Sequence, residues 1–230
     1  MAAVTVDRPA TTLVEAVPAA DPAPLGLAAF ALTTFLLSGH NASFIPDLIW
    51  VGPAIFYGGI AQFCAGMWEF RNRNVFGATA FSTYGGFWMG LGLFIILGVD
   101  TSKWLAAYTG GDLTNALAWF LFAFAIFNTY MLMWSTRVSV AVFLVFLTLE
   151  ATEILLAIGN FREAHGHSAY ITHVGGWVGI ATAAAAWYAS AAGVINGMAP
   201  RRILPVGAPP WDRLPFISNL GSPMPRRIEA

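Results

Sequence analysis

Long apolar runs separated by short polar segments dominate the chain. Four of them, residues 25–46, 48–68, 75–99 and 113–136, contain no Asp, Glu, Lys or Arg. A fifth, 138–161, is interrupted by Glu150 and Glu153, and a sixth, 174–196, is the apolar core of a longer uncharged stretch. Because a membrane-spanning helix needs about 20 predominantly apolar residues, the pattern predicts six transmembrane helices. The expected fold class is therefore an all-α polytopic membrane protein.

The composition agrees with a chain that lies mostly in lipid. Charged residues make up 10% of the 230 residues and hydrophobic residues 57%, whereas an average soluble domain is about 25% charged. The single cysteine, Cys64, excludes an intramolecular disulfide. A net charge of −1 gives no indication of a nucleic-acid partner.

The distribution of basic residues predicts the orientation. With six spans, one side would carry Arg8, Arg71, Arg73, Arg137, Arg201, Arg202, Arg213, Arg226 and Arg227, and the other only Lys103 and Arg162. Cytoplasmic loops collect Lys and Arg, so we expect both termini in the cytoplasm and the protein in the cell membrane. We expect a flexible N-terminal tail (1–20), a six-helix transport domain (21–200) and a proline-rich C-terminal tail (201–230).

Motifs that would indicate an enzyme are absent from the sequence. It contains no HExxH, GxSxG or Walker A pattern. His165 and His167 form an H-x-H pair in a loop, where solvated histidines are the usual interpretation. The only lysine, Lys103, lies in a loop and not in a span, which excludes a retinal Schiff base. We therefore expect a permease or channel with no cofactor and no metal.

Two acids inside the fifth apolar run are candidate functional residues. A carboxylate at the centre of a spanning helix costs about 2.5–3.5 kcal/mol, and intramembrane acids commonly mark a substrate or proton route. Glu150 and Glu153 are three residues apart and share one helix face. They are either a proton-handling or substrate-facing pair, or hydrogen-bonded carboxyls that tie helices together.

Several sequence blocks resemble the acetate uptake transporter family, which includes bacterial succinate–acetate permeases. The first is PAPLGL at 22–27, which is similar to that family's Asn-Pro-Ala-Pro-Leu-Gly-Leu signature. Further blocks follow in the family's order: FYGGIAQFCAGMWEF (56–70), NVFGATAFSTYGGFW (74–88), LLAIGN (155–160) and HVGGW (173–177). Together they cover roughly residues 21–205.

The resemblance implies a six-helix protomer, assembled as a hexamer with one conduction route in each protomer. It implies transport of acetate and of other short carboxylates such as succinate, either as a proton-coupled carrier or as an anion channel. It also implies a narrow apolar constriction formed by Phe30, Tyr84 and Leu149.

The constriction gives the two glutamates different expected directions. Glu153 follows Leu149 by four residues and lies about 40° around the helix, whereas Glu150 lies about 100° away. We expect Glu153 to face the pore and Glu150 to face a neighbouring helix. Because desolvation disfavours a charged carboxyl, we expect Glu153 to be largely neutral and able to handle a proton.

The signature block also carries a departure from the family, with Asp21 in place of Asn. We expect Asp21 to cap the first helix, with Pro22 at its first and Pro24 at its third position, where a missing N–H is no loss. Gly26 would permit a close helix contact just before Phe30. The resemblance places this entrance motif near the substrate at the cytoplasmic mouth, where a negative charge would disfavour an anion. Its residues are Asp21, Pro22, Pro24, Leu25, Gly26 and Leu27.

Two other functions remain compatible with the sequence. A channel for a small neutral solute such as urea or a short amide could share a six-helix, hexameric architecture. A non-transporting membrane sensor or assembly protein would use the proline-rich tail as its functional part. Uptake measurements with labelled solutes and deletion of residues 206–230 would distinguish these alternatives.

Overall fold

The computed structural model describes residues 19–99 and 112–213, and all their regular secondary structure is helical. Five helices are long and apolar enough to cross a membrane. They are α1 (Ala23–Asn41), α4 (Val75–Val99), α5 (Asp112–Ser135), α6 (Val140–Ala164) and α7 (Tyr170–Met198). Each lies within a few residues of a run predicted from hydropathy. The chain is therefore a multi-pass membrane protein.

The second predicted span is helical but not one regular α-helix. It consists of α2 (Val51–Ile55), the π-helical turn η1 (Phe56–Ala61) and α3 (Gln62–Arg71). At 1.5 Å per residue, these 21 consecutive residues extend for about 31 Å, the thickness of a bilayer core. The structure thus has five uninterrupted spans and one interrupted helical segment, instead of six regular helices.

Small residues permit close packing at the interruption. A Cβ atom at Gly58 would lie 2.5 Å from the hydroxyl oxygen of Thr33 on α1, and one at Gly59 would lie 2.5 Å from Met89 on α4. Helix backbones approach closely in lipid where residues are small. The π-helical turn therefore lies in direct contact with α1 and α4.

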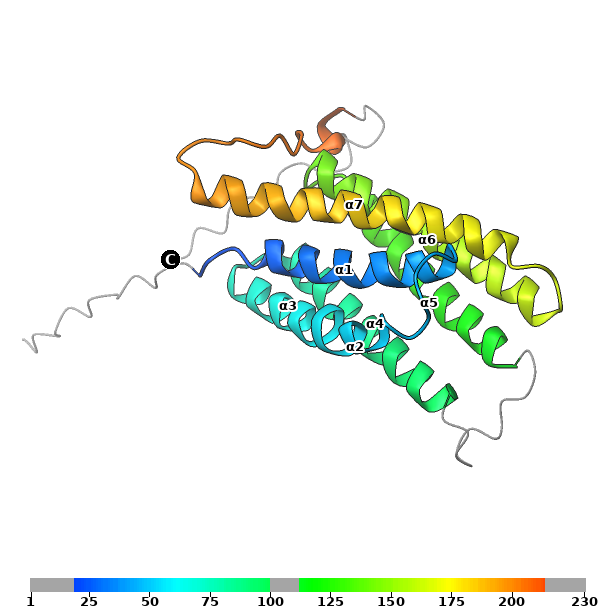
Figure 1. Ribbon diagram of the computed structural model, residues 1–230. Helices are drawn as coiled ribbons and strands as arrows, with labels where there is room; N and C mark the ends of the chain where they lie inside the picture. The colour runs from blue at the N-terminus through cyan, green and yellow to red at the C-terminus, as the bar shows by residue number, and fades with distance from the viewer. Residues whose placement is uncertain (1–18, 100–111, 214–230) are drawn as a thin grey trace, which may run out of the picture.

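The long helices run side by side, and α1 packs between the α2–α3 segment and α7 (Figure 1). Helix α6 packs against both α5 and α7, and α4 packs against α2, η1 and α3. The buried core is rich in aromatic residues of α1, α4 and α6, among them Phe30, Phe81, Tyr84, Phe87 and Phe146. This arrangement surrounds a central axis with side chains from α1, α4, α5 and α6.

Helix α1 begins one residue later than the sequence predicted. Pro22 and not Asp21 occupies the N-cap position, although the Asp21 carboxylate still accepts a hydrogen bond from the Ala23 N–H at 2.9 Å. Pro22 already has helical dihedral angles (φ −83°, ψ −11°). The difference therefore concerns only which residue is assigned as the first of the helix. Asp21 satisfies one otherwise unpaired donor of the first turn, as a capping residue does.

Residues 199–209, which follow α7, have no regular secondary structure and are docked against the bundle (Figure 1). The Val206 carbonyl accepts from the Ala141 N–H at 2.9 Å, and the Tyr188 hydroxyl donates to the Pro205 carbonyl at 2.6 Å. The segment ends in a short 3₁₀ helix, η2 (Pro210–Arg213). There the Arg137 guanidinium lies 4.0 Å from the centre of the Trp211 ring. Residues 1–18 and 214–230, most of the two predicted tails, lie outside the described residues.

Candidate transport pathway

Three cavities follow one another along the axis of the bundle. The widest, about 250 Å³, opens at the end where α1 leads into α2 and α6 leads into α7; we call it the outer chamber. The second, about 30 Å³, is the central cavity. Both are lined by Leu37, Leu121 and Leu156, so only a few leucine side chains separate them. A third cavity of about 60 Å³ lies towards the opposite end.

The central and third cavities are one helical turn apart on the same three helices. Phe30, Tyr84 and Leu149 line the central cavity, from α1, α4 and α6 respectively. Leu27, Phe81 and Phe146, each three residues earlier, line the third cavity. All six are buried, with exposed fractions of at most 9%. Three apolar side chains therefore narrow the axis at two successive levels.

The three residues predicted to form a constriction are brought together at the central cavity. The rings of Phe30 and Tyr84 contact each other edge to face, with centroids 5.7 Å apart. Tyr84 is also packed against Phe87 and Phe127, at centroid distances of 6.0 and 5.5 Å. These contacts fix the tyrosine ring, so its hydroxyl has a defined position.

Three residues that line this mostly apolar cavity each carry a polar atom without a hydrogen-bond partner. Among the described residues, Thr34 Oγ1, Trp88 Nε1 and Glu153 Oε2 are buried and make no hydrogen bond. All three residues line the central cavity. Because an unpaired buried polar atom is costly, such a group of atoms suits a route along which a polar solute passes.

The two glutamates point in different directions, as their positions on the helix predicted. Glu153 is 3% exposed and lines the central cavity, with Oε1 3.3 Å from the Tyr84 hydroxyl. Glu150 points to α5, where its two carboxylate oxygens accept from Asn128 Nδ2 and from the Thr129 hydroxyl, each at 2.7 Å. Glu150 therefore ties α6 to α5 and does not line the central cavity.

The entrance motif lies where α1 begins, next to the third cavity. Ala23 and Leu27 line that cavity, whereas Leu25 is exposed. A Cβ atom at Gly26 would lie 2.7 Å from the Phe81 ring, so Gly26 makes the close contact expected of it. The Pro24 carbonyl accepts a hydrogen bond from the Ser190 hydroxyl at 2.7 Å, which ties the start of α1 to α7.

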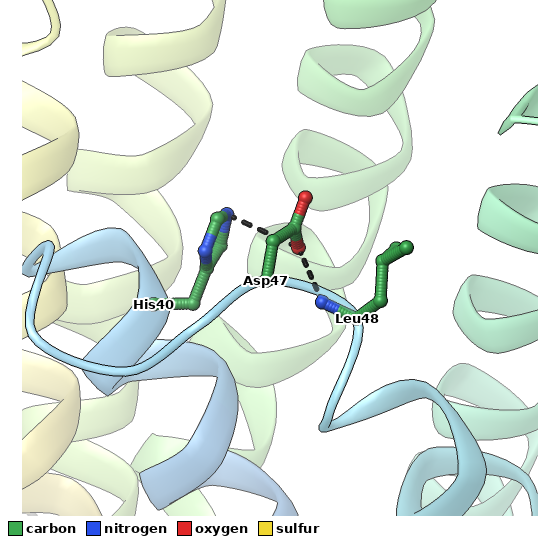
Figure 2. A network of polar contacts seen from close by, with 3 residues as sticks. All are labelled: His40, Asp47 and Leu48. Atoms are coloured by element: carbon green, nitrogen blue, oxygen red, sulfur yellow. Dashed lines mark hydrogen bonds and ion pairs between the residues drawn. The ribbon is translucent and has the colours of Figure 1, made fainter.

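The outer chamber contains polar residues that the sequence analysis did not place in a transport pathway. Its lining includes His40, Asn41, Asn160 and His173. Figure 2 shows His40 beside Asp47, with Nε2 and Oδ1 3.4 Å apart, while the same Asp47 oxygen accepts from the Leu48 N–H at 2.7 Å. The chamber thus offers a partly polar approach to the central cavity.

The sequence analysis also overlooked Asn128. It is fully buried in the middle of α5 and contacts both Tyr84 and Glu150. A signal was present, because Asn128 is an amide near the middle of the apolar run 113–136, and intramembrane polar residues commonly have partners. In residues 19–99 and 112–213, no group of three or more His, Cys, Asp or Glu side chains could hold a metal ion.

Comparison with known proteins decides the family. The model of the GPR1/FUN34/yaaH family matches residues 6–208. The chain belongs to this family. It is 43% identical over 181 residues to accumulation of dyads protein 2 of Saccharomyces cerevisiae, covering 76% of this chain and 61% of the yeast protein. The chain thus spans less than two thirds of that relative's length.

Bacterial members of the GPR1/FUN34/yaaH family match over nearly their whole length. The succinate-acetate/proton symporter SatP of Escherichia coli K12 is 35% identical over 195 residues, which are 82% of this chain and 95% of SatP. The solved structure of the bacterial acetate channel SatP superposes with a TM-score of 0.74 at 36% identity, covering 82% of this chain and 99% of that one. The family resemblance noted in the sequence is therefore confirmed.

Proposed function

We propose that this protein is a transporter, and not an enzyme, that carries acetate and other short-chain carboxylates such as succinate across the cell membrane. The observation that carries the proposal is the central cavity, where Phe30, Tyr84 and Leu149 form a narrow apolar passage below a polar chamber. The names of the bacterial relatives, an acetate channel and a succinate-acetate/proton symporter, support this substrate class.

The passage suits a small monocarboxylate for a physical reason. A carboxylic acid with a pKa of about 4.3 is only about one part in 500 neutral at pH 7. The anion does not cross lipid unaided, because burying a bare charge is expensive. Between its apolar walls the passage offers a few polar groups that can donate a hydrogen bond to a carboxylate, among them the Thr34 hydroxyl and the Trp88 indole N–H. A short, partly dehydrated carboxylate could use these atoms in sequence, and a bulky one would be excluded.

We further propose six crossings in each protomer, with the interrupted segment 51–71 as the second. Its length matches a bilayer core, and its two ends lie at the two opposite ends of the bundle (Figure 1). Arg71, Arg73, Arg137, Arg201 and Arg202 then belong to one side, which supports a cytoplasmic location for both termini. The transport unit is residues 21–200, assembled as a hexamer in which each protomer has its own route.

The decisive experiment measures acetate flux into liposomes that contain the purified protein. Labelled acetate uptake is compared with and without an imposed pH gradient, and labelled urea is the matched neutral solute. Acetate uptake above that of empty liposomes, with no urea uptake, supports the proposal. Acceleration by an inward proton gradient at zero membrane potential indicates proton coupling, whereas flux that follows only the membrane potential indicates an anion channel. Urea uptake without acetate uptake would contradict the proposed function.

A further inference from the structure

The side chain of Asn128 has only one satisfactory orientation. Its Nδ2 lies 3.1 Å from the Phe146 carbonyl and 2.7 Å from Glu150 Oε2. The Phe146 carbonyl can only accept a hydrogen bond, and the same is true of a carboxylate oxygen. The amide nitrogen must therefore face α6. The amide oxygen then faces the Tyr84 hydroxyl, 2.9 Å away.

This orientation determines where the tyrosine proton goes. A tyrosine hydroxyl has one proton, and the Asn128 oxygen at 2.9 Å is a closer acceptor than Glu153 Oε1 at 3.3 Å. When the proton points to Asn128, the Tyr84 oxygen presents a lone pair to Glu153. An ionised Glu153 would also present a lone pair there, and the two oxygens would repel each other in a buried site. A protonated Glu153 instead donates to Tyr84 and satisfies both oxygens.

Among the described residues that line the central cavity around Glu153, none is a Lys, Arg or His that would favour the ionised form. Along the lining of the central cavity, the titratable groups are Glu153 itself and Tyr84 of α4. Glu150 lies one turn away on the same helix. The side chains that face the site from α1 and α5 are uncharged, and α7 reaches it through Thr182, which is bonded to Thr152 at 3.1 Å. Burial of an unpaired charge here is unfavourable.

We propose that Asn128 is a positioning residue that, through the Tyr84 hydroxyl, keeps Glu153 protonated and leaves Glu153 Oε2 as a hydrogen-bond acceptor for the protonated form of a short carboxylic acid. With the acid proton on Oε1, the free Oε2 is a carbonyl oxygen, and it is the atom of this cavity-lining residue that has no hydrogen-bond partner. It complements the O–H of a neutral acid and repels the oxygens of an anion. The substrate class in this inference rests on the proposed function, whereas the protonation of Glu153 does not.

Infrared difference spectroscopy tests the protonation directly in the full-length protein. The spectrum of the wild type minus that of Glu153→Gln is expected to contain the C=O band of a protonated carboxyl near neutral pH. Absence of this band would overturn the proposal. In Tyr84→Phe, Glu153 loses the acceptor of its proton, so the band is expected to move to higher frequency; an unmoved band would contradict the proposed contact.

Asn128→Leu tests the positioning role with a side chain that has the same branching but no hydrogen-bonding groups. Without the amide oxygen, the Tyr84 hydroxyl is free to donate to Glu153 and stabilise its ionised form. The band is then expected to disappear at a pH lower by about one unit, the effect of one hydrogen bond to a charged group. Ser135→Ala removes another fully buried polar group of α5, bonded only within its own helix, and is expected to leave the titration unchanged. Equal titrations of Asn128→Leu and the wild type would overturn the role of Asn128.

Acetate flux provides the functional measurement. In Asn128→Leu, the ratio of uptake near neutral pH to uptake in mild acid should fall by about tenfold, the population change for one pH unit. The Asn128 substitution should have no further effect on this ratio in a Glu153→Gln background. A fall that persists in that background would show that Asn128 does not act through Glu153. If the wild type carries no acetate, the proposed function fails, and the infrared spectra still decide the protonation of Glu153.

Discussion

The ring of Phe30 lies edge to face against the ring of Tyr84, with centroids 5.7 Å apart and planes inclined by 65°. The two residues are 54 positions apart in the chain and come from α1 and α4. Leu149 of α6 completes the lining on this level of the central cavity. Three helices therefore contribute one side chain each to the lining of the central cavity at this level.

Truncation of this lining should broaden the range of solutes. Phe30→Ala or Leu149→Ala should raise the uptake of lactate and succinate relative to acetate by about tenfold, because the fit of a single methylene in an apolar pocket already changes selectivity by such factors. The measurement is competitive uptake in proteoliposomes. Phe122→Ala is the matched control, since Phe122 is 45% exposed and lines neither the central nor the third cavity. Unchanged ratios would show that these residues do not form the constriction.

Replacement of the cavity-facing acid should separate transport from its pH dependence. Glu153→Gln preserves the shape of a protonated carboxyl, so acetate uptake in mild acid should remain close to that of the wild type. The decline of acetate uptake towards alkaline pH should be weaker in Glu153→Gln than in the wild type, because Gln cannot ionise. Glu150→Gln, whose side chain points to α5, is the control and should keep the wild-type profile. Identical profiles for Glu153→Gln and the wild type would contradict a proton-handling role.

The capping residue of α1 should affect flux and stability independently. Asp21→Asn keeps an oxygen that can accept from the Ala23 N–H, so the thermal unfolding temperature in detergent should not change. At low ionic strength, acetate flux should rise because a negative charge near the entrance is removed, and added salt should diminish the difference. Asp21→Ala removes the cap and should destabilise the protein by about 1 kcal/mol. Flux that is insensitive to both substitutions would leave Asp21 with a capping role alone.

A glycine pair provides a matched test of helix packing. Gly26→Ala would place a Cβ atom 2.7 Å from the Phe81 ring, and overpacking of this kind costs about 1–3 kcal/mol. Gly86→Ala meets no atom within 4 Å and should be neutral or slightly stabilising, because alanine favours the helix. Thermal unfolding of the two variants measures the difference. Equal unfolding temperatures would show that α1 and α4 can separate at little cost.

The docked segment after α7 should contribute to stability and not to transport. Deletion of residues 206–230 removes the Val206 carbonyl that accepts from the Ala141 N–H, and the Trp211 ring that stacks on Arg137. The expected loss is about 1–3 kcal/mol, from one hydrogen bond and one cation–π contact. Acetate flux per folded protein should persist. Loss of flux from a protein that remains folded would favour a sensor or assembly protein that acts through its tail.

The positions of the helices follow from the sequence because lipid imposes a simple requirement. A span must be long, apolar and internally hydrogen-bonded, and the runs of uncharged residues therefore predicted α4 at its observed bounds and the other long helices within a few residues. The same reasoning could not foresee the π-helical turn in 51–71. In that turn, Gly58 makes a close contact with Thr33 and Gly59 with Met89. Contacts between different helices cannot be predicted from hydropathy.

Part of the pathway could also be read from the sequence. The spacing of Leu149, Glu150 and Glu153 on one helix indicated that Glu153 shares a side with Leu149 and that Glu150 does not, since helical periodicity is a local property. The family resemblance supplied Phe30 and Tyr84 as candidates. No local pattern indicated that Asn128, on another helix, lies between Tyr84 and Glu150.

The sequence by itself determined that the chain is a helical membrane protein, where its spans lie and which face of α6 carries the central carboxyl, because these depend on hydropathy and on the helical repeat. Only the tertiary structure decided which polar atoms of different helices meet. The direction of the Asn128 amide, and with it the proton between Tyr84 and Glu153, depends on distances of about 3 Å between side chains of α4, α5 and α6. Such distances result from the packing of whole helices, which no single segment encodes.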